Sequence, residues 1–467
     1  MTGRLIIASN RTASPGEPKV GGLAVAIWEA LSERGGGVWF GWSGETLERE
    51  TRGVRLFAED NVDFALADLT EAEYEGYYLG YANRALWPVF HYRVDLAHFD
   101  ETEFATYEEV NRRFGRLLAQ FTRPDDTVWV HDYHFLLMGQ EMRTSGWEGP
   151  MGFFLHIPFP APEIFTSLPQ HRRIARALCA FDLIGFQTER DRANFERYLV
   201  EIDQASSSSD GTISVFGRTL RTKAFPIGID ADEIVNLANS EEGRSAASRL
   251  GRIIDQRALV LGVDRMDYSK GLPQRMHAFG RMLDENEHIR GRVSFLQIAP
   301  PSREDVDTYQ DLRIELDQVT GRINGDHGDL DWVPIRYLAR GYPRGMLSGL
   351  YRLARVGLVT PLYDGMNLVA KEFVAAQDPE DPGTLVLSEF AGAAEQLQGA
   401  IFVNPHDIAA TADAIQQGIN MPLEERIERW KSMDAAVRAQ SIAWWRRAFL
   451  DELESLGKPA PDTEVES

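Results

Sequence analysis

Short, continuously apolar runs alternate with helical patterns along most of the chain, and this alternation restricts the fold more than any other feature of the sequence. The first half contains five runs typical of buried strands: residues 4–9, 37–42, 127–132, 151–158 and 183–188. The second half contains four more: residues 258–265, 293–300, 356–361 and 384–389. Strands that are apolar on both faces are typical of parallel sheets covered by helices on both sides. The two series therefore predict an α/β fold of two Rossmann-like, doubly wound domains.

The two series meet near residue 230, in a chain whose 467 residues exceed the size of one ordinary domain. We expect an N-terminal domain over 1–230 and a C-terminal domain over 231–440. A long helical pattern covers 428–456. We expect the end of it, 441–458, to form a C-terminal helix that packs back on the N-terminal domain. The tail 459–467 is polar and contains proline, which predicts disorder.

Charge and cysteine content exclude several classes of protein. The formal net charge is −22, which argues against a nucleic-acid binder or a polybasic membrane anchor. The single cysteine, Cys179, allows no disulfide within the chain and lies in an apolar stretch typical of a buried residue. The first residues are too polar for a signal peptide, and no apolar run is long enough to span a membrane. These features predict a cytoplasmic protein without membrane or nucleic-acid partners.

Polar residues gather just after the predicted strands. In doubly wound sheets, ligands bind outside the carboxyl ends of the strands, so residues at these positions are the first candidates for a site. The candidates of this kind are Asn10, Arg11, Asp132, His156, Arg265, Lys270, Ser302, Arg303, Asp364 and Glu372. Their shared position along successive strand–helix units is a stronger signal than any one of them.

The segment 259–273, LVLGVDRMDYSKGLP, places Arg265 and Lys270 directly after a buried strand and before a glycine. It can be a solvated strand-to-helix turn, or a socket for a doubly negative group. Gly21 and Gly22 open another helix, whose free N–H groups can bind an anion. That glycine pair is not the GxGxxG fingerprint of dinucleotide-binding proteins.

A second informative segment is 361–377, PLYDGMNLVAKEFVAAQ. Asp364 precedes a helix start and can accept hydrogen bonds from sugar hydroxyls. Glu372, about two turns into the helix, can accept from ribose hydroxyls or lie on a solvated face. His156 alone is more typical of a structural histidine.

Two patterns resemble metal sites, but we expect no metal and no cofactor. His131 and His134 flank Asp132 without a third ligand at a recognisable spacing. Asp-x-Asp triplets occur at 230–232, 305–307 and 329–331. Asp230 and Asp232 follow the segment PIGI and are typical of helix caps.

Together these segments resemble the trehalose-6-phosphate synthases. The resemblance runs from about residue 4 to about residue 450 and is carried by ordered motifs: SNR…GGLAVAI, WFGWSGE, LWPVFHYR, HDYHFLL, FFLHIPFPAPEIF, GFQTERDRANF, DRMDYSKGLP, QIAPPSREDVDTYQDLR, GRINGDHG and DGMNLVAKEFVAAQ. It implies a retaining glycosyltransferase of the GT-B fold, in which two Rossmann-like domains face each other across a cleft.

The resemblance implies a donor site and an acceptor site. By position, the donor residues are Gly21, Gly22, Arg265, Lys270, Asp364, Gly365, Met366, Asn367, Leu368 and Glu372. Arg265 and Lys270 match the clamp on the donor diphosphate, and Glu372 matches the carboxylate on the ribose. The acceptor residues are Arg11, Tyr78, Trp87, Asp132 and Arg303, with both arginines on the phosphate of glucose 6-phosphate. Asp132 and His156 match residues at the reacting sugars.

The implied reaction transfers glucose from a nucleotide diphosphate glucose to glucose 6-phosphate and yields α,α-trehalose 6-phosphate with the donor's configuration retained. The implied catalytic residues are Asp132, His156, Arg265 and Lys270. UDP-glucose is the family's commonest donor, and the residues alone leave ADP and GDP open. Oligomeric state, including a homo-oligomer, also stays open. The alternatives are a related transferase with another phosphorylated acceptor and a non-catalytic sugar-phosphate sensor.

Overall fold

The computed structural model describes residues 3–14, 16, 22–49, 53–255, 257–302 and 307–456. Its internal contacts divide the chain into two compact units, which are described separately. Unit 1 comprises Met1–Phe225 and Trp445–Ser467, and unit 2 comprises Pro226–Trp444. The predicted disordered tail, 459–467, lies outside the described residues. No helix among the residues in these ranges is long and apolar enough to cross a membrane.

Unit 1 contains a ten-stranded sheet in the order β3-β4-β2-β1-β5-β6-β7-β10-β9-β8. Its strands are β1 (Leu5–Arg11), β2 (Gly37–Leu47), β3 (Arg55–Glu59), β4 (Val62–Thr70), β5 (Thr127–His131), β6 (Met151–Phe154), β7 (Leu183–Phe186), β8 (Ser206–Ser207), β9 (Thr212–Val215) and β10 (Arg218–Ala224). The strands from β4 to β10 pair in parallel, and β3, β9 and β8 are added antiparallel at the two edges. The five predicted strands pair in parallel, as expected, and the antiparallel strands at the edges lie outside the predicted apolar runs.

The helices of unit 1 are α1 (Gly22–Glu33), α2 (Glu71–Glu73), η1 (Tyr74–Leu86), α3 (Trp87–Phe90), η2 (Val94–Leu96), α4 (Glu101–Phe121), η3 (Tyr133–Phe135), α5 (Met138–Thr144), α6 (Pro162–Phe165), α7 (His171–Leu178), α8 (Glu189–Asp203) and α17 (Ile442–Leu456). The segment η1 is a π-helix with a kink at Gly80, where ψ is −105°. π-Helical turns occur frequently at functional sites, and this one precedes Trp87 directly.

The C-terminal helix α17 packs on the sheet of unit 1. Trp445 and Phe449 are fully buried, and the ring of Phe449 stacks on Trp129 with centroids 4.5 Å apart. Gly152 and Gly185 make room for it, since a Cβ at either position would lie 2.7–2.8 Å from the Phe449 ring. The pattern over 428–456 predicted one long helix, but the chain breaks at Gln440 and forms α16 and α17 instead.

Unit 2 contains a six-stranded sheet in the order β13-β12-β11-β14-β15-β16, in which every pairing is parallel. Its strands are β11 (Ala258–Val263), β12 (Val293–Ile298), β13 (Ile335–Leu338), β14 (Val356–Val359), β15 (Thr384–Ser388) and β16 (Ile401–Val403). Its helices are α9 (Ala231–Ala238), α10 (Glu241–Ile254), η4 (Tyr268–Lys270), α11 (Leu272–Glu285), η5 (Glu287–Ile289), α12 (Asp307–His327), α13 (Arg344–Leu353), α14 (Leu368–Ala376), η6 (Gly392–Glu395), α15 (Ile408–Asn420) and α16 (Leu423–Ala439).

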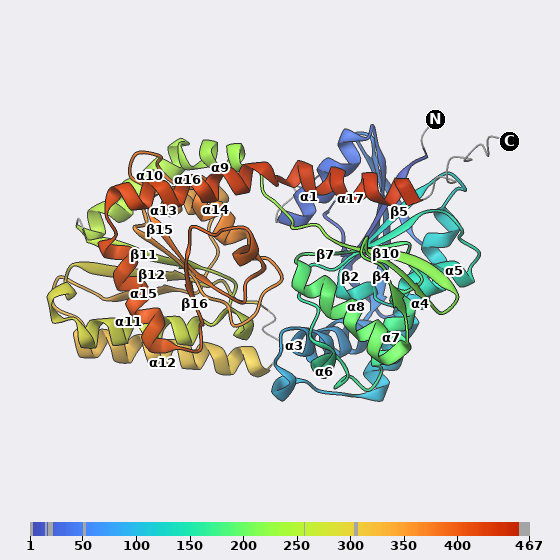
Figure 1. The fold of residues 1–467 in the computed structure, drawn as a ribbon, viewed down its shortest axis with the longest axis horizontal. Helices are drawn as coiled ribbons and strands as arrows, with labels where there is room; N and C mark the ends of the chain where they lie inside the picture. Colours follow the sequence, from blue (N-terminus) through green and yellow to red (C-terminus); the bar gives the residue numbers. More distant parts are fainter. Residues whose placement is uncertain are drawn as a thin grey trace. The chain divides into compact units, whose positions relative to one another are not determined.

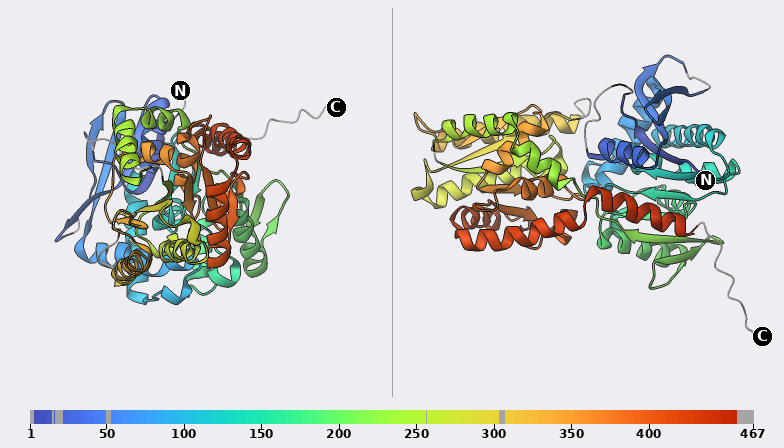
Figure 2. Two further views of the ribbon diagram at one scale, coloured as in Figure 1. Left: turned by 90° about the vertical axis from the view of Figure 1, so that its left-hand side faces the viewer. Right: turned by 90° about the horizontal axis from the view of Figure 1, so that it is seen from above.

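The layers of unit 2 have the doubly wound arrangement that the alternation predicts. Helices α9, α10, α13, α14 and α16 cover one face of the sheet, and α11, α12 and α15 cover the other (Figure 1). The left view of Figure 2 shows unit 2 from its end, with helices above and below the strands. Strand β11 is central, so its carboxyl end opens at the middle of the unit, where the turn 264–271 begins.

Candidate functional site

The turn after β11 is held rigidly in unit 2. The fully buried Asp267 accepts hydrogen bonds from the Ser269 N–H at 3.0 Å and from the Tyr309 hydroxyl at 3.0 Å. Gly271 has φ +64°, and a Cβ there would lie 2.4 Å from the Thr360 carbonyl oxygen. The turn therefore requires glycine at this position, and packs against the end of the neighbouring strand β14.

Lys270 and Asp364, which follow different strands, meet in the structure. The Lys270 Nζ lies 2.5 Å from Asp364 Oδ2, and the Asn367 side-chain amide donates to the same oxygen at 3.1 Å. Asn367 also caps α14, because its side chain accepts from the Ala370 N–H at 3.3 Å. Its φ of +76° is one that asparagine tolerates better than most residues. The sequence motif DGMN is thus one local structure that joins a helix start to a charged pair.

No pattern in the sequence indicated Arg275, which links these groups through hydrogen bonds. Its guanidinium is fully buried and donates to Asp264 at 2.8 Å, to the Thr360 hydroxyl at 3.2 Å and to the Lys270 carbonyl at 3.2 Å. Asn367 reaches the other oxygen of Asp264 at 3.4 Å. A buried guanidinium with several acceptors holds a planar, rigid network, so Arg275 keeps the two candidate loops in register.

Burial perturbs the acid–base groups of α14. It raises the pKa of Glu372 to about 6, and the Tyr351 hydroxyl donates to this carboxylate at 3.4 Å. The neighbouring Lys371 is fully buried, and burial lowers its pKa to about 7 while its ammonium donates to the Ile227 carbonyl at 2.6 Å. Strongly perturbed groups at a helix start are typical of functional sites.

The other predicted donor residues lie on the same loops. Arg265 follows β11 and is exposed to solvent, in contrast to the buried Lys270. Gly365 and Met366 are buried between Asp364 and the helix, and Leu368 is the first residue of α14. Gly21 lies outside the described residues, and Gly22 is the first residue of α1 in unit 1.

Asp132 and His156 lie together at the carboxyl ends of β5 and β6 in unit 1. The Asp132 carboxylate accepts from the His156 N–H at 3.2 Å, and the Asp132 N–H donates to the Phe154 carbonyl at 2.8 Å. Asp132 has φ +75° and ψ 166°, a conformation that costs a residue other than glycine about 1–3 kcal/mol. Such strain is found at sites where the surrounding structure holds a side chain in one direction.

His156 is paired with a second histidine. Its Nε2 lies 3.0 Å from Nδ1 of His131, and the Gln187 side chain lies 3.5 Å from its Nδ1. Burial lowers the pKa of His156 to about 3, and it lowers the pKa of His131 well below the usual value. Both imidazoles are therefore neutral at physiological pH.

The predicted acceptor residues of unit 1 surround an aromatic cluster. Arg11 ends β1 and is exposed, with its guanidinium 6.0 Å from the centre of the Trp42 ring. Tyr78, on the π-helix, lies 5.8 Å from Trp42 and stacks on His134 at 5.7 Å. Trp42 thus connects Arg11 to Tyr78, although the sequence pattern indicated only that it ends a buried strand.

Trp87 begins α3 beside this cluster. Its ring centroid lies 4.1 Å from His91 and 5.6 Å from Tyr133. Arg303, predicted to bind the acceptor phosphate, lies outside the described residues.

The patterns that resembled metal sites have other roles where the structure describes them. Asp230 caps α9, as predicted, by accepting from the Glu233 N–H at 2.9 Å. Asp232 pairs with Arg438 at 2.7 Å, and Asp331 lies 3.6 Å from Arg257. Within the described ranges, no three or more His, Cys, Asp or Glu side chains gather as metal ligands. The triplet member Asp305 lies outside those ranges.

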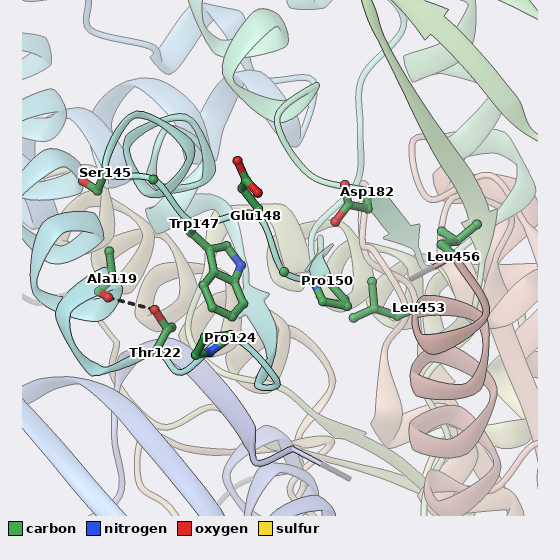
Figure 3. Close-up of a pocket in the computed structure, with 12 residues that line it drawn as sticks. Ala119, Thr122, Pro124, Ser145, Trp147, Glu148, Pro150, Asp182, Leu453 and Leu456 are labelled. Atoms are coloured by element: carbon green, nitrogen blue, oxygen red, sulfur yellow. Dashed lines mark hydrogen bonds between the residues drawn. The ribbon is translucent and has the colours of Figure 1, made fainter. Parts of the chain in front are cut away.

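A cavity of about 690 Å³ lies at the amino ends of strands β6 and β7 of unit 1 (Figure 3). Trp147, Pro150 and Asp182 line it, and these residues precede β6 and β7 rather than follow them. None of the predicted site residues lines this cavity. We do not assign the site to this cavity, because the charged groups and the groups with perturbed pKa values lie at the carboxyl ends of the strands.

Comparison with known proteins gives matches over almost the whole chain. The model of glycosyltransferase family 20 matches residues 8–455. The trehalose-6-phosphate synthase of Sinorhizobium fredii is 46% identical over 454 residues, covering 96% of this chain and 98% of that protein. The crystal structure of a UDP-forming α,α-trehalose-phosphate synthase from Burkholderia vietnamiensis has a TM-score of 0.95 and 47% identity, with 98% of each chain covered. That of the Burkholderia xenovorans enzyme in complex with glucose-6-phosphate has a TM-score of 0.92 and 46% identity, covering 97% of this chain and all of that one.

Proposed function

Because the chain belongs to glycosyltransferase family 20, we propose that it transfers glucose from UDP-glucose to glucose 6-phosphate and releases α,α-trehalose 6-phosphate and UDP. The predictions of a glycosyltransferase, of the GT-B fold and of similarity to trehalose-6-phosphate synthases are confirmed by the family model and by relatives matched over nearly their full length. The donor, the retention of configuration, the roles of single residues and a cytoplasmic location are proposals.

The observation that carries the proposal is the cluster of Lys270, Asp364 and Asn367 at the ends of β11 and β14. An ammonium, a carboxylate and an amide at one helix start can grip a diphosphate and the hydroxyls of the sugar attached to it. The name of the Burkholderia vietnamiensis enzyme, UDP-forming, supports UDP-glucose as the donor.

In this proposal, Arg265 and Lys270 stabilise the charge that builds on the diphosphate as it leaves. Arg265 is exposed to solvent, and the buried Lys270 is held in place by Asp364 and by the rigid turn. Charge that develops only in the transition state is stabilised best by groups that are already oriented. Removing one such donor costs roughly 2.7–4 kcal/mol of barrier.

Glu372 is proposed to hold the ribose of the donor. A carboxylate with two oxygens can accept from both ribose hydroxyls, and the Tyr351 hydroxyl orients one of them. Burial raises the pKa of Glu372 to about 6, which is still below neutral pH. The carboxylate is therefore ionised at pH 7 and can accept hydrogen bonds.

Unit 1 is proposed to supply most of the acceptor contacts, from Arg11, Tyr78 and Trp87, whereas Arg303 belongs to unit 2. Arg11 and Arg303 would bind the phosphate of glucose 6-phosphate, while Tyr78 and Trp87 would contact its ring. The complex of the Burkholderia xenovorans enzyme with glucose-6-phosphate supports this acceptor. The cation and the aromatic rings around Trp42 offer the chemistry that a sugar phosphate needs.

We propose that the acceptor attacks the same face of the donor glucose that the diphosphate leaves, so that the leaving phosphate takes the proton of the acceptor hydroxyl. Retaining glycosidases instead use a carboxylate nucleophile. The Asp132 carboxylate, the carboxylate among the residues proposed for the reacting sugars, accepts a hydrogen bond from the His156 backbone, which suits a positioning role. Metal ions have no step in this mechanism.

The proposal is tested by incubating purified protein with glucose 6-phosphate and each of UDP-, ADP- and GDP-glucose, with product mass and anomeric configuration as readouts. We expect trehalose 6-phosphate with both anomeric carbons of its single 1,1-linkage in the α configuration, formed fastest from UDP-glucose. A β configuration at the anomeric carbon from the donor would refute retention, and no disaccharide phosphate from any donor would refute the transferase.

A further inference from the structure

His131 is buried at the end of β5, and it is not among the residues proposed above to bind a substrate. Its side chain is enclosed by the rings of Trp129, Phe154 and Trp445, with centroids at 4.5, 6.4 and 6.2 Å. Its Nε2 is buried and has no hydrogen-bond partner among the described residues. The polar contact of this imidazole is therefore the one between its Nδ1 and Nε2 of His156 at 3.0 Å.

This contact allows only paired protonation states. A neutral imidazole carries one N–H donor and one acceptor nitrogen. When His131 holds its hydrogen on Nδ1, His156 must accept at Nε2 and present an N–H at Nδ1. When His131 holds it on Nε2, His156 must donate from Nε2 and present a lone pair at Nδ1. The position of the hydrogen on His131 thus determines whether Nδ1 of His156 is a hydrogen-bond donor or an acceptor.

The far side of His156 is the polar one. Its Nδ1 faces the Gln187 side chain at 3.5 Å, and its backbone N–H is held by Asp132. The aromatic enclosure of His131 comes from β5, β6 and α17, and both His131 and Trp445 are fully buried. The hydrogen bond made by one ring nitrogen of a histidine sets whether the other nitrogen carries the proton.

We propose that His131 is a positioning residue, which fixes the tautomer and the ring orientation of His156 for glucosyl transfer. This inference rests on the proposed function, because it assumes that His156 acts on the reacting sugars. His131 itself touches no substrate, since its side chain is fully buried.

The test compares His131→Phe, which removes the polar partner but keeps a ring, with His131→Asn, whose amide can replace Nδ1. His171→Phe is the matched control, because His171 also makes a side-chain hydrogen bond in unit 1, to the Tyr198 hydroxyl at 2.7 Å. We expect His131→Phe to lower kcat by roughly ten- to a hundredfold. This is the loss seen in metalloproteins when the group that orients a metal-binding histidine is removed. Both KM values should change less than about threefold, and His131→Asn should recover most of kcat, because only the partner of His156 is replaced.

A readout independent of activity is ¹⁵N NMR of the imidazoles, with the His156 signals identified by their loss in His156→Gln. We expect one His156 tautomer in the unsubstituted protein and an average of two in His131→Phe. Two tautomers in the unsubstituted protein would overturn the proposal even if the variants did not fold. Unchanged kcat in His131→Phe, or a lowered kcat with one tautomer kept, would also overturn it. If the unsubstituted protein makes no trehalose 6-phosphate, the proposed function fails, whereas the NMR still decides whether His131 selects the tautomer.

Discussion

Gly44, in the loop-like end of β2, determines where the Arg11 guanidinium can lie. A Cβ at position 44 would come within 2.8 Å of Nε and Nη2 of Arg11 and 2.9 Å of its Cζ, closer than real Cβ atoms approach. Because Arg11 is exposed, its side chain can move away at little cost in stability. Gly44→Ala should therefore fold normally but displace the cation that we propose for the acceptor phosphate.

The size of the effect follows from the contact that is lost. A hydrogen bond to a charged group contributes about 1.5–3 kcal/mol, and about 1.4 kcal/mol corresponds to a tenfold change in affinity. The KM for glucose 6-phosphate should rise roughly ten- to a hundredfold. The KM for UDP-glucose should stay within about twofold, because Arg11 is not among the proposed donor contacts.

The matched control is Gly146→Ala. Gly146 has φ +90°, close to the +94° of Gly44, but a Cβ there would have no atom within 4 Å. Both variants carry the same backbone strain, about 1–2 kcal/mol for a left-handed residue with a Cβ, so their melting temperatures should fall alike. Steady-state kinetics with each substrate varied in turn would check this. An equal KM for glucose 6-phosphate in the two variants would refute the assignment of Arg11.

Three further predictions concern unit 2. Lys270→Ala should lower kcat about 10²–10³-fold at saturating substrates, as for the loss of an oxyanion donor, and a loss below tenfold would contradict its role on the diphosphate. The KM for UDP-glucose should rise as the pH falls through about 6, where protonation turns one acceptor oxygen of Glu372 into a donor, and Glu372→Gln should abolish this dependence in kinetics between pH 5 and 8. Arg275→Met should lower the free energy of unfolding by roughly 3–5 kcal/mol, since it leaves Asp264 buried without its cation; the exposed Arg281→Met on the same helix should cost under about 1 kcal/mol in the same urea titration.

The central strands could be predicted because helices bury both of their faces. The apolar run 258–265 becomes β11, which ends at Val263 because Asp264 begins the charged turn. The edge strand β3 has four exposed residues out of five, so it has no continuous apolar run to recognise. Strand β10 has Leu220 and Ala224 as its apolar residues among charged residues and threonines, so it also lacks a continuous apolar run.

The positions of the site residues were predictable from strand ends, but the contacts that hold them were not. Lys270 and Asp364 each follow a strand, and parallel strands bring their carboxyl ends to one edge. Arg275 lies in a helix where the sequence cannot distinguish a buried arginine from a solvated one, because its acceptors, Asp264 and Thr360, come from two strands. The π-helix η1 likewise depends on a hydrogen-bond pattern that apolar spacing does not encode.

The pairing of Lys270 with Asp364 shows how a protein with a high negative charge can maintain a binding site for an anion. Lys270 is 9% exposed, and a cation buried to this extent without a counterion would be costly. Asp364 neutralises it in the structure, and Asn367 shares the same carboxylate oxygen. A bound diphosphate would supply the counter-charge instead and release Asp364 to accept from sugar hydroxyls, while the Asn367 amide keeps that carboxylate in place. Neither the ammonium nor the carboxylate would then be left unpaired at any stage, so the donor would bind without the cost of an unpaired buried charge. The buried Arg275–Asp264 pair makes this exchange local, because it fixes the backbone of Lys270 while the ammonium changes partners.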